Sequence, residues 1–243
     1  MAGGCPVPVL GCFGPKYPKA GCPMNQLPAF DIDRLIAQRQ TTKVLAQDEL
    51  PPDRLVEEAL DALVAAAGWA PFHRPCDASH RQMPGDPGGI EPWRLYVLDA
   101  PNCRRLRSDV VGMPEAGKIP AMLAAASGLV LATWLPNPAA TELPAGWLFE
   151  PTLGNMEHIA AASAAIQNLL LAATARAIPN YWSSGGVLRS PEIFDRLGIP
   201  RTQILLGAVF LFPTDVGSAE VVGSKLRSSR TPPAKWSRRI QLV

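Results

Sequence analysis

Residues 38–44, QRQTTKV, bring two cations and several hydrogen-bonding side chains into one short stretch. Arg39 can offer a bidentate guanidinium fork, Thr41 a hydroxyl group and Lys43 a point charge. This combination suits an anion such as a phosphate group. Taken alone, however, the segment is more typical of a solvated helix end with ordinary basic residues. Its interpretation therefore depends on the segments around it.

Residues 180–186, NYWSSGG, place a large aromatic ring beside nearly bare backbone. The stretch has neither a helix pattern nor a strand pattern. Because serine and glycine add little bulk, the backbone of 183–186 can lie close to a flat ring and offer N–H donors to it. The alternative is a plain helix-terminating turn that carries a core tryptophan.

The histidines other than His73 and the cysteines form no recognisable catalytic pattern. His80 and His158 have no visible partner, so we expect a solvated loop residue and a first-turn helix residue. Cys76 and Cys103 have no neighbouring base that would activate a thiol. We expect no metal site, because a C-x-x-C pair is missing among Cys5, Cys12 and Cys22.

Composition narrows the class of protein. The 243 residues are 47% hydrophobic and 18% charged, which is enough to bury one sizeable core. A formal net charge of +2 with scattered arginines argues against nucleic acid as a partner. The richest apolar run, 159–173, is interrupted by polar residues, so we expect no membrane span. The N-terminus resembles neither a secretory signal nor a transit peptide, which favours the cytoplasm.

The chain divides into an arm and one domain. Residues 1–28 are rich in proline, glycine and cysteine without periodic apolar positions, and they predict an extended arm. Residues 29–243 predict a single domain that contains a loop insertion at 74–90, where breakers abound and no period is visible. No G-x-G-x-x-G or P-loop motif accompanies the strands.

Apolar periodicity predicts the order of elements in this domain. Asp31 can cap a short helix that ends near Gln38, Asp53 can open a helix that ends at Gly68, and Asn102 can cap a basic helix. We expect strands at 93–99, 128–135 and 203–212, a long helix at 157–177, and an irregular basic tail from 213 onward. The long helix is apolar on nearly all faces and rich in alanine, which favours close helix packing at a subunit interface.

Several of these segments resemble the nitroreductase-like FMN flavoproteins, most closely the short single-domain bacterial nitroreductases. QRQTTKV resembles the family's R-x-[ST]-x-[KR] signature, and WAPFH followed by EPWRLYVL resembles its "AP" and "QPW" pair. AIQNLLLAATARAIPNYWSSG resembles the family's long-helix block with "YW-SG", and FDRLGIP before ILLGAVFLF is similar to its "LGIP" turn and strand. The resemblance runs from about 30 to 236 with four motifs in order.

The resemblance implies an α+β fold with a mainly antiparallel central sheet flanked by helices. It also implies an interlocked homodimer with two FMN molecules at the interface. By the same resemblance, the FMN contacts are Arg39, Gln40, Thr41, Lys43, Trp69, His73, Tyr181, Trp182, Ser183, Ser184, Gly185 and Arg230. Gln40 departs from the basic residue common in relatives, Phe72 replaces a polar residue, and Lys225 and Arg227 rival Arg230 as the phosphate contact.

In this interpretation Trp69 and His73 reach the partner subunit's FMN, and Lys43 stabilises the reduced flavin. A His73 that closes a helix C-terminus is the alternative. The flavin carries the chemistry, which explains the lack of a catalytic triad, and NADH or NADPH supplies the electrons. The expected function is transfer of electrons to nitroaromatics, quinones or another electron-poor small molecule. The alternatives are an FMN oxidase or dehydrogenase that tailors one metabolite, and a non-catalytic flavin-binding redox sensor.

Overall fold

The computed structural model describes residues 29–242, so the arm expected at 1–28 lies outside the described residues. Helices and strands are mixed along the chain, as predicted. The α-helices are α1 Ala29–Gln38, α2 Arg54–Ala67, α3 Ala78–Arg81, α4 Ala100–Val110, α5 Ile119–Ala125, α6 Leu153–Ala175 and α7 Pro191–Leu197. The strands are β1 Thr42–Leu45, β2 Trp93–Asp99, β3 Gly128–Trp134, β4 Asn180–Ser183, β5 Ile204–Leu211 and β6 Glu220–Gly223. Short 3-10 turns are η1 Gly186–Arg189, η2 Lys225–Arg227 and η3 Pro233–Lys235.

The main sheet has four strands in the order β2-β3-β5-β4, and every neighbouring pair is antiparallel. β3 is buried along its whole length because it lies between β2 and β5 and is covered on both faces. A second, two-stranded sheet pairs β1 with β6 antiparallel, with Lys43 opposite Val222. The expected α+β fold with a mainly antiparallel sheet is therefore confirmed.

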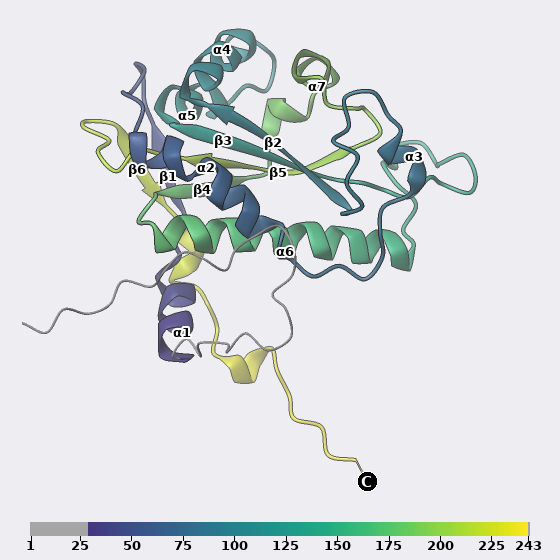
Figure 1. Ribbon diagram of the computed structural model, residues 1–243. Coiled ribbons are helices and arrows are strands. Elements are labelled where there is room, and N and C mark those ends of the chain that lie inside the picture. Colours follow the sequence, from purple (N-terminus) through teal and green to yellow (C-terminus); the bar gives the residue numbers. More distant parts are fainter. Residues whose placement is uncertain (1–28, 243) are drawn as a thin grey trace, which may run out of the picture.

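Helices cover both faces of the main sheet, with α4, α5 and α7 on one face and α2 and α6 on the other (Figure 1). Side-chain alternation divides each strand between the two cores. In β3, Leu129 and Leu131 pack toward α4 and α5, whereas Val130 and Ala132 pack toward α2 and α6. The continuous apolar runs of β3 and β5 follow from this double burial.

α6 is the longest described element, and it spans the width of the sheet (Figure 1). Its length and apolar composition match those of a membrane-spanning helix. Its buried side chains, among them Ile166 and Leu169, pack instead in the same core as α2 and the sheet. The opposite side of α6 is partly exposed, so burial all round is not reached within one chain.

Several local expectations need correction. α4 begins at Ala100, because the Asp99 side chain accepts from the Asn102 backbone N–H and takes the cap position expected for Asn102. α6 begins at Leu153 behind the cap Thr152, and it ends at Ala175 instead of residue 177. The expected cap Asp31 lies within the first turn of α1. α5 and β6 were not anticipated, and β6 shows that the tail is not wholly irregular.

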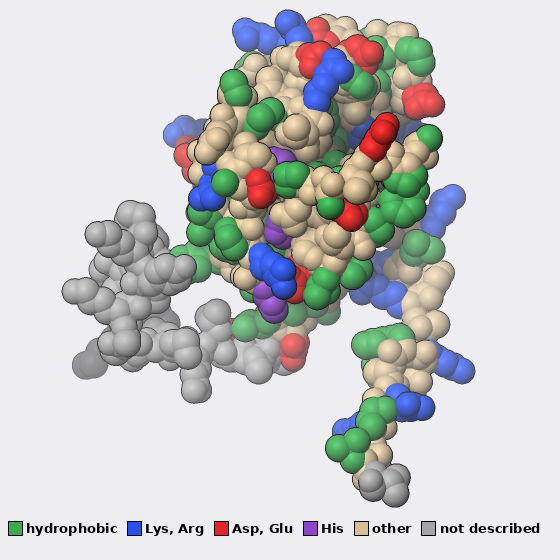
Figure 2. Space-filling model, turned by 90° about the vertical axis from the view of Figure 1, so that its right-hand side faces the viewer, with side chains coloured by type: hydrophobic (Ala, Val, Ile, Leu, Met, Phe, Trp, Pro, Cys, Tyr) green, Lys and Arg blue, Asp and Glu red, His purple; other side chains and the backbone are tan. Residues whose placement is uncertain are grey.

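The C-terminal tail leaves the body of the molecule after η2 and carries alternating cationic and apolar side chains (Figure 2). Among the described residues, donors that follow Arg227 in the chain form hydrogen bonds only with acceptors of the tail itself. Trp236 is 70% exposed and Leu242 is 94% exposed. Such exposure of large apolar side chains on an extended segment is typical of a surface that another chain covers.

Candidate functional site

The segment from α1 to β1 is held by the tail. Arg227 donates from its two terminal nitrogens to the backbone oxygens of Ala37 at 2.7 Å and Arg39 at 2.9 Å. The last turn of α1 has no basic residue of its own, so Arg227 supplies the donors that its free carbonyls need. Arg227 thereby joins the tail to two residues that lie 188 and 190 positions earlier in the chain.

Three guanidinium groups gather at this junction. Burial lowers the pKa of Arg39, and the nearby charges of Arg230 and then Arg227 lower it further. None of the three forms an ion pair with a carboxylate among the described residues. Like charges brought together without a counter-charge form a site for an anion. The cluster is called the arginine cluster below, and it contains Arg39, Arg227 and Arg230.

The chain after α1 is extended, so successive side chains point to opposite sides. Lys43 lies with its Nζ 5.0 Å from the centre of the Tyr181 ring, close enough for a cation–π contact between β1 and β4. Gln40 and Thr42 instead line a separate cavity of about 290 Å³ at the C-terminal end of α6. Thr41 is half-buried between them. The structure therefore brings Lys43 and Tyr181 together and places Gln40 elsewhere.

The stretch 180–183 forms strand β4, against our expectation of irregular backbone. It pairs with β5, and Trp182 stands opposite Val209. The indole occupies the space above the neighbouring Gly207, where an added Cβ would lie 1.9 Å from Trp182 Nε1. The Trp182 side chain therefore packs against β5, on the opposite face of the sheet from the Tyr181 side chain.

The backbone after β4 turns sharply, and its conformation is fixed from two sides. Gly185 has φ +105° and Gly186 has φ +52°, a region that favours glycine. The Gly185 N–H donates to the Ser183 hydroxyl oxygen at 3.2 Å. Arg189 Nε donates to the Ser184 carbonyl oxygen at 2.5 Å. The bare stretch is thus a braced turn beside the Lys43–Tyr181 contact.

Arg189 is a residue of this site that the sequence did not reveal. Burial lowers its pKa, and it has no carboxylate partner among the described ion pairs. Its second contact, to the Leu206 carbonyl oxygen at 3.4 Å, ties the turn to β5. Only its position just after the glycine pair hinted at such a role.

We predict that Gly185→Val destabilises this turn and, with it, the flavin site that the family resemblance implies. A Cβ at Gly185 would lie 2.6 Å from Leu205 Cδ2, and the positive φ adds backbone strain of about 1–3 kcal/mol. Urea unfolding and the flavin-to-protein ratio after purification measure the two effects. Gly223→Val is the matched control because nothing lies within 4 Å of its Cβ position. Equal stability and flavin content in both variants would contradict the assignment.

Trp69 and His73 follow α2, and both side chains are exposed; Trp69 is 63% exposed. Between them, Phe72 packs edge-to-face on Trp93 with ring centres 5.6 Å apart, which explains a hydrophobic residue at that position. Arg74 then pairs with Glu157 on α6 at 3.1 Å. Both residues lie on the segment between α2 and α3, and their role toward a partner subunit stays a prediction.

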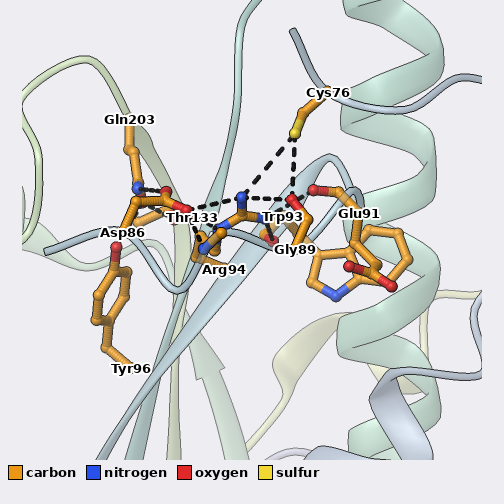
Figure 3. A network of polar contacts seen from close by, with 10 residues as sticks. Cys76, Asp86, Gly89, Glu91, Trp93, Arg94, Tyr96, Thr133 and Gln203 are labelled. Carbon is orange, nitrogen blue, oxygen red and sulfur yellow. Dashed lines mark hydrogen bonds and ion pairs between the residues drawn. The ribbon is translucent and has the colours of Figure 1, made fainter. Parts of the chain in front are cut away.

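The insertion at 74–90 is not a loose loop. It contains α3, and it closes around Arg94 through a polar network (Figure 3). Asp86, whose side chain is 0% exposed, accepts from Arg94 Nε at 2.8 Å and from Gln203 Nε2 at 2.9 Å. Arg94 also donates to the backbone oxygens of Gly89, Glu91 and Trp93. Every nitrogen of this buried guanidinium is therefore bonded.

Two isolated side-chain expectations are also corrected. His80 is buried, with Nε2 2.7 Å from the Pro136 carbonyl oxygen, and is not a solvated loop residue. His158 lies beyond the first turn of α6, is buried, and contacts the Leu135 carbonyl oxygen through Nδ1 at 2.9 Å.

Burial raises the pKa of the Cys103 thiol to about 12, and Cys76 is buried as well, so neither is an exposed nucleophile. Within residues 29–242 no group of three metal-binding side chains occurs; the expectation for Cys5, Cys12 and Cys22 lies outside them.

Comparison with known proteins places this geometry in context. A protein-family model described as the Nitroreductase family matches residues 36–211. The structure is similar to a nitroreductase-like family protein from Bacillus cereus, with 22% identity, TM-score 0.57, and coverage of 86% of this chain and 96% of that one. It is also similar to a protein from Desulfovibrio desulfuricans described as a nitroreductase in complex with FMN, with 19% identity, TM-score 0.52, and coverage of 87% and 98%.

A third similar structure is the NfrA1 nitroreductase from B. subtilis, with 15% identity, TM-score 0.55, and coverage of 86% of this chain and 74% of that one. No curated protein sequence matches the chain. The family model covers both the β1 segment that follows Arg39 and the turn after β4. With most of its length matched by that model, the chain belongs to the nitroreductase family.

Proposed function

We propose that the protein is an FMN-dependent oxidoreductase that passes electrons from NADH or NADPH to a nitroaromatic, a quinone or another electron-poor small molecule. The observation that carries this proposal is the arginine cluster of a chain of this family, whose three cations have no carboxylate partner within residues 29–242. A phosphate group supplies the negative charge that such a cluster lacks.

The residues fit FMN at three points. Arg39, with Arg227 and Arg230, would hold the phosphate group. Lys43 would place its charge beside the flavin ring, and the turn at 183–186 would approach the ring with backbone donors. When bound, FMN supplies hydride acceptance from a nicotinamide and electron transfer to an acceptor. The chain itself would supply position and positive charge.

The test is anaerobic reduction of the purified protein. We expect a yellow protein whose flavin absorption is bleached by NADH or NADPH and recovers when an acceptor such as menadione is added. Bound flavin that neither nicotinamide bleaches would favour a metabolite-tailoring enzyme or a redox sensor instead. A colourless protein that cannot be reconstituted with FMN would refute all three functions.

We further propose that the protein is a cytoplasmic homodimer in which the tail of each subunit lies on its partner. This is supported by the exposed Trp236 and Leu242 and by the partly exposed apolar side of α6. A second copy of the chain would remove these surfaces from water.

Trp236→Asp combined with Ile240→Asp should therefore shift the protein toward a monomer. Each change puts a charge where an apolar side chain is exposed in the single chain, at 70% and 64% respectively. Light scattering after size exclusion gives the mass. Ser237→Asp with Gln241→Asp adds the same charge at polar positions of the same tail and should stay dimeric. A monomeric wild type, or a dimeric Trp236/Ile240 variant, would contradict the tail's role.

A further inference from the structure

A second cavity lies at the N-terminal end of α6, between the insertion and the segment that follows β3. Its volume is about 270 Å³, comparable to that of about nine water molecules. The insertion contributes Ser79, His80 and Met83 from α3 and the residues just after it. The facing wall comes from residues 136–150 and is mainly apolar, with Leu143, Leu148 and Phe149.

The facing wall is anchored at both of its ends. Asn155 on α6 accepts from the Asn137 backbone N–H at 2.8 Å and donates to the Glu150 carbonyl oxygen at 2.8 Å. His80 reaches across to the Pro136 carbonyl oxygen at 2.7 Å and so joins the two walls directly. The backbone segments that border the cavity are therefore held in place by hydrogen bonds.

The insertion wall is anchored by the network around Arg94 (Figure 3). Asp86 follows Met83 closely in the chain, and its buried carboxylate is bonded to both Arg94 and Gln203. Thr202, which also lines the cavity, precedes Gln203 directly. The buried ion pair thus fixes the insertion beside the cavity.

The polar residues that line the cavity are Ser79, His80, Asn137, Glu150 and Thr202, and of these only His80 is buried. Because a carbonyl oxygen only accepts, His80 Nε2 must carry the proton in this contact. In the neutral ring Nδ1 is then an acceptor, and it takes part in no hydrogen bond among the described residues. His80 as a residue is only 4% exposed. An occupant with one O–H or N–H donor would match this acceptor.

This cavity is separate from the arginine cluster within one chain. α6 has 23 residues, so at 1.5 Å per residue it is roughly 35 Å long. α3 lies at its N-terminal end, whereas α1 and β1 lie toward its C-terminal end (Figure 1). A ligand of either site would therefore not touch the other in the same subunit.

We propose that this cavity is a second small-molecule site, which takes a neutral aromatic molecule of one or two rings with a single hydrogen-bond donor. The volume sets the size, the apolar wall favours an uncharged ring, and His80 accepts from the donor. Leu148, which is 70% exposed at the edge of the cavity, would be covered by the bound ring. The proposal does not depend on the flavin assignment.

Titration of the full-length protein with 1-naphthol, followed by calorimetry, tests the proposal. The protein is saturated with FMN, or left as purified if it binds none, and no nicotinamide is added. We expect saturable binding of one molecule per chain, and at least tenfold weaker binding of 1-methoxynaphthalene, which lacks the donor, and of 1-naphthoate, which is charged. Absence of 1-naphthol binding, or equal binding of all three, would overturn the proposal.

Two variants locate the bound molecule. Met83→Trp fills the cavity, and Leu148→Asp puts a charge at its exposed edge with little risk to folding. Each should weaken 1-naphthol binding at least tenfold. Val111→Asp makes the same kind of change at another exposed apolar residue and should have no effect. Unchanged binding in Leu148→Asp, or loss of binding in Val111→Asp, would place the molecule elsewhere and overturn the assignment.

Discussion

Arg39→Ala should weaken FMN binding roughly ten- to a hundredfold while its effect on riboflavin binding stays small. A charge-assisted hydrogen bond contributes about 1.5–3 kcal/mol, and riboflavin lacks the phosphate group that Arg39 would hold. Quenching of flavin fluorescence on titration with protein gives both dissociation constants. Far-UV circular dichroism should show that the fold is kept.

Arg34→Ala is the matched control for Arg39→Ala. Arg34 lies on α1, which ends just before Arg39, is exposed, and has no hydrogen bond or ion pair among the described contacts. Its loss removes one positive charge without removing a member of the arginine cluster. If the two variants bind FMN equally well, or if Arg39→Ala weakens riboflavin as much as FMN, the phosphate assignment is wrong.

Asp86→Ala should lower the free energy of unfolding by about 3–5 kcal/mol, because it leaves the Arg94 charge buried without a partner. The side chains of this pair are 4% and 0% exposed, so water cannot take over the role of Asp86 without local unfolding. For a chain of this size the loss corresponds to a drop in Tm of about 10 °C. Differential scanning calorimetry measures it.

The control for Asp86→Ala is Asp195→Ala. Asp195 also pairs with an arginine, Arg201, at 2.5 Å, but both side chains are more than half exposed. Such surface pairs contribute about 0–1 kcal/mol. Comparable Tm shifts in the two variants would show that the Asp86–Arg94 pair does not stabilise the insertion.

The sequence predicted those elements whose residues carry their own signal. β3 and β5 are nearly continuous apolar runs, β2 is largely apolar, and α2 has both its capping Asp53 and its terminal Gly68. β4 was missed because its strand character comes from pairing with β5 and not from NYWS itself. Neither of two distant segments predicts by itself that it will pair with the other.

The candidate site divides in the same way. The resemblance singled out Arg39, Lys43 and the turn at 183–186, which are contiguous motifs. It could not show that Gln40 faces a different cavity, because the direction of a side chain depends on where the strand docks. Arg189 was missed because its partner is the carbonyl group of Ser184, and a backbone group leaves no trace in the sequence.

The burial of His80 was likewise beyond local inference. The residue lies among loop-forming neighbours, and its partner Pro136 is 56 positions away. The insertion looked unstructured because its order depends on Arg94 and Gln203, both outside it. Hydrogen bonds between buried polar groups that lie far apart in the chain cannot be recognised from the sequence alone.

The Arg94 network also has a consequence for the order of folding. Asp86 and its partner Gln203 are 117 positions apart, so on the ribosome the insertion is made long before β5 can close over it. Closing a loop of this length costs entropy before the contact can contribute to stability. The insertion therefore gains this anchor only when the chain around Gln203 has docked.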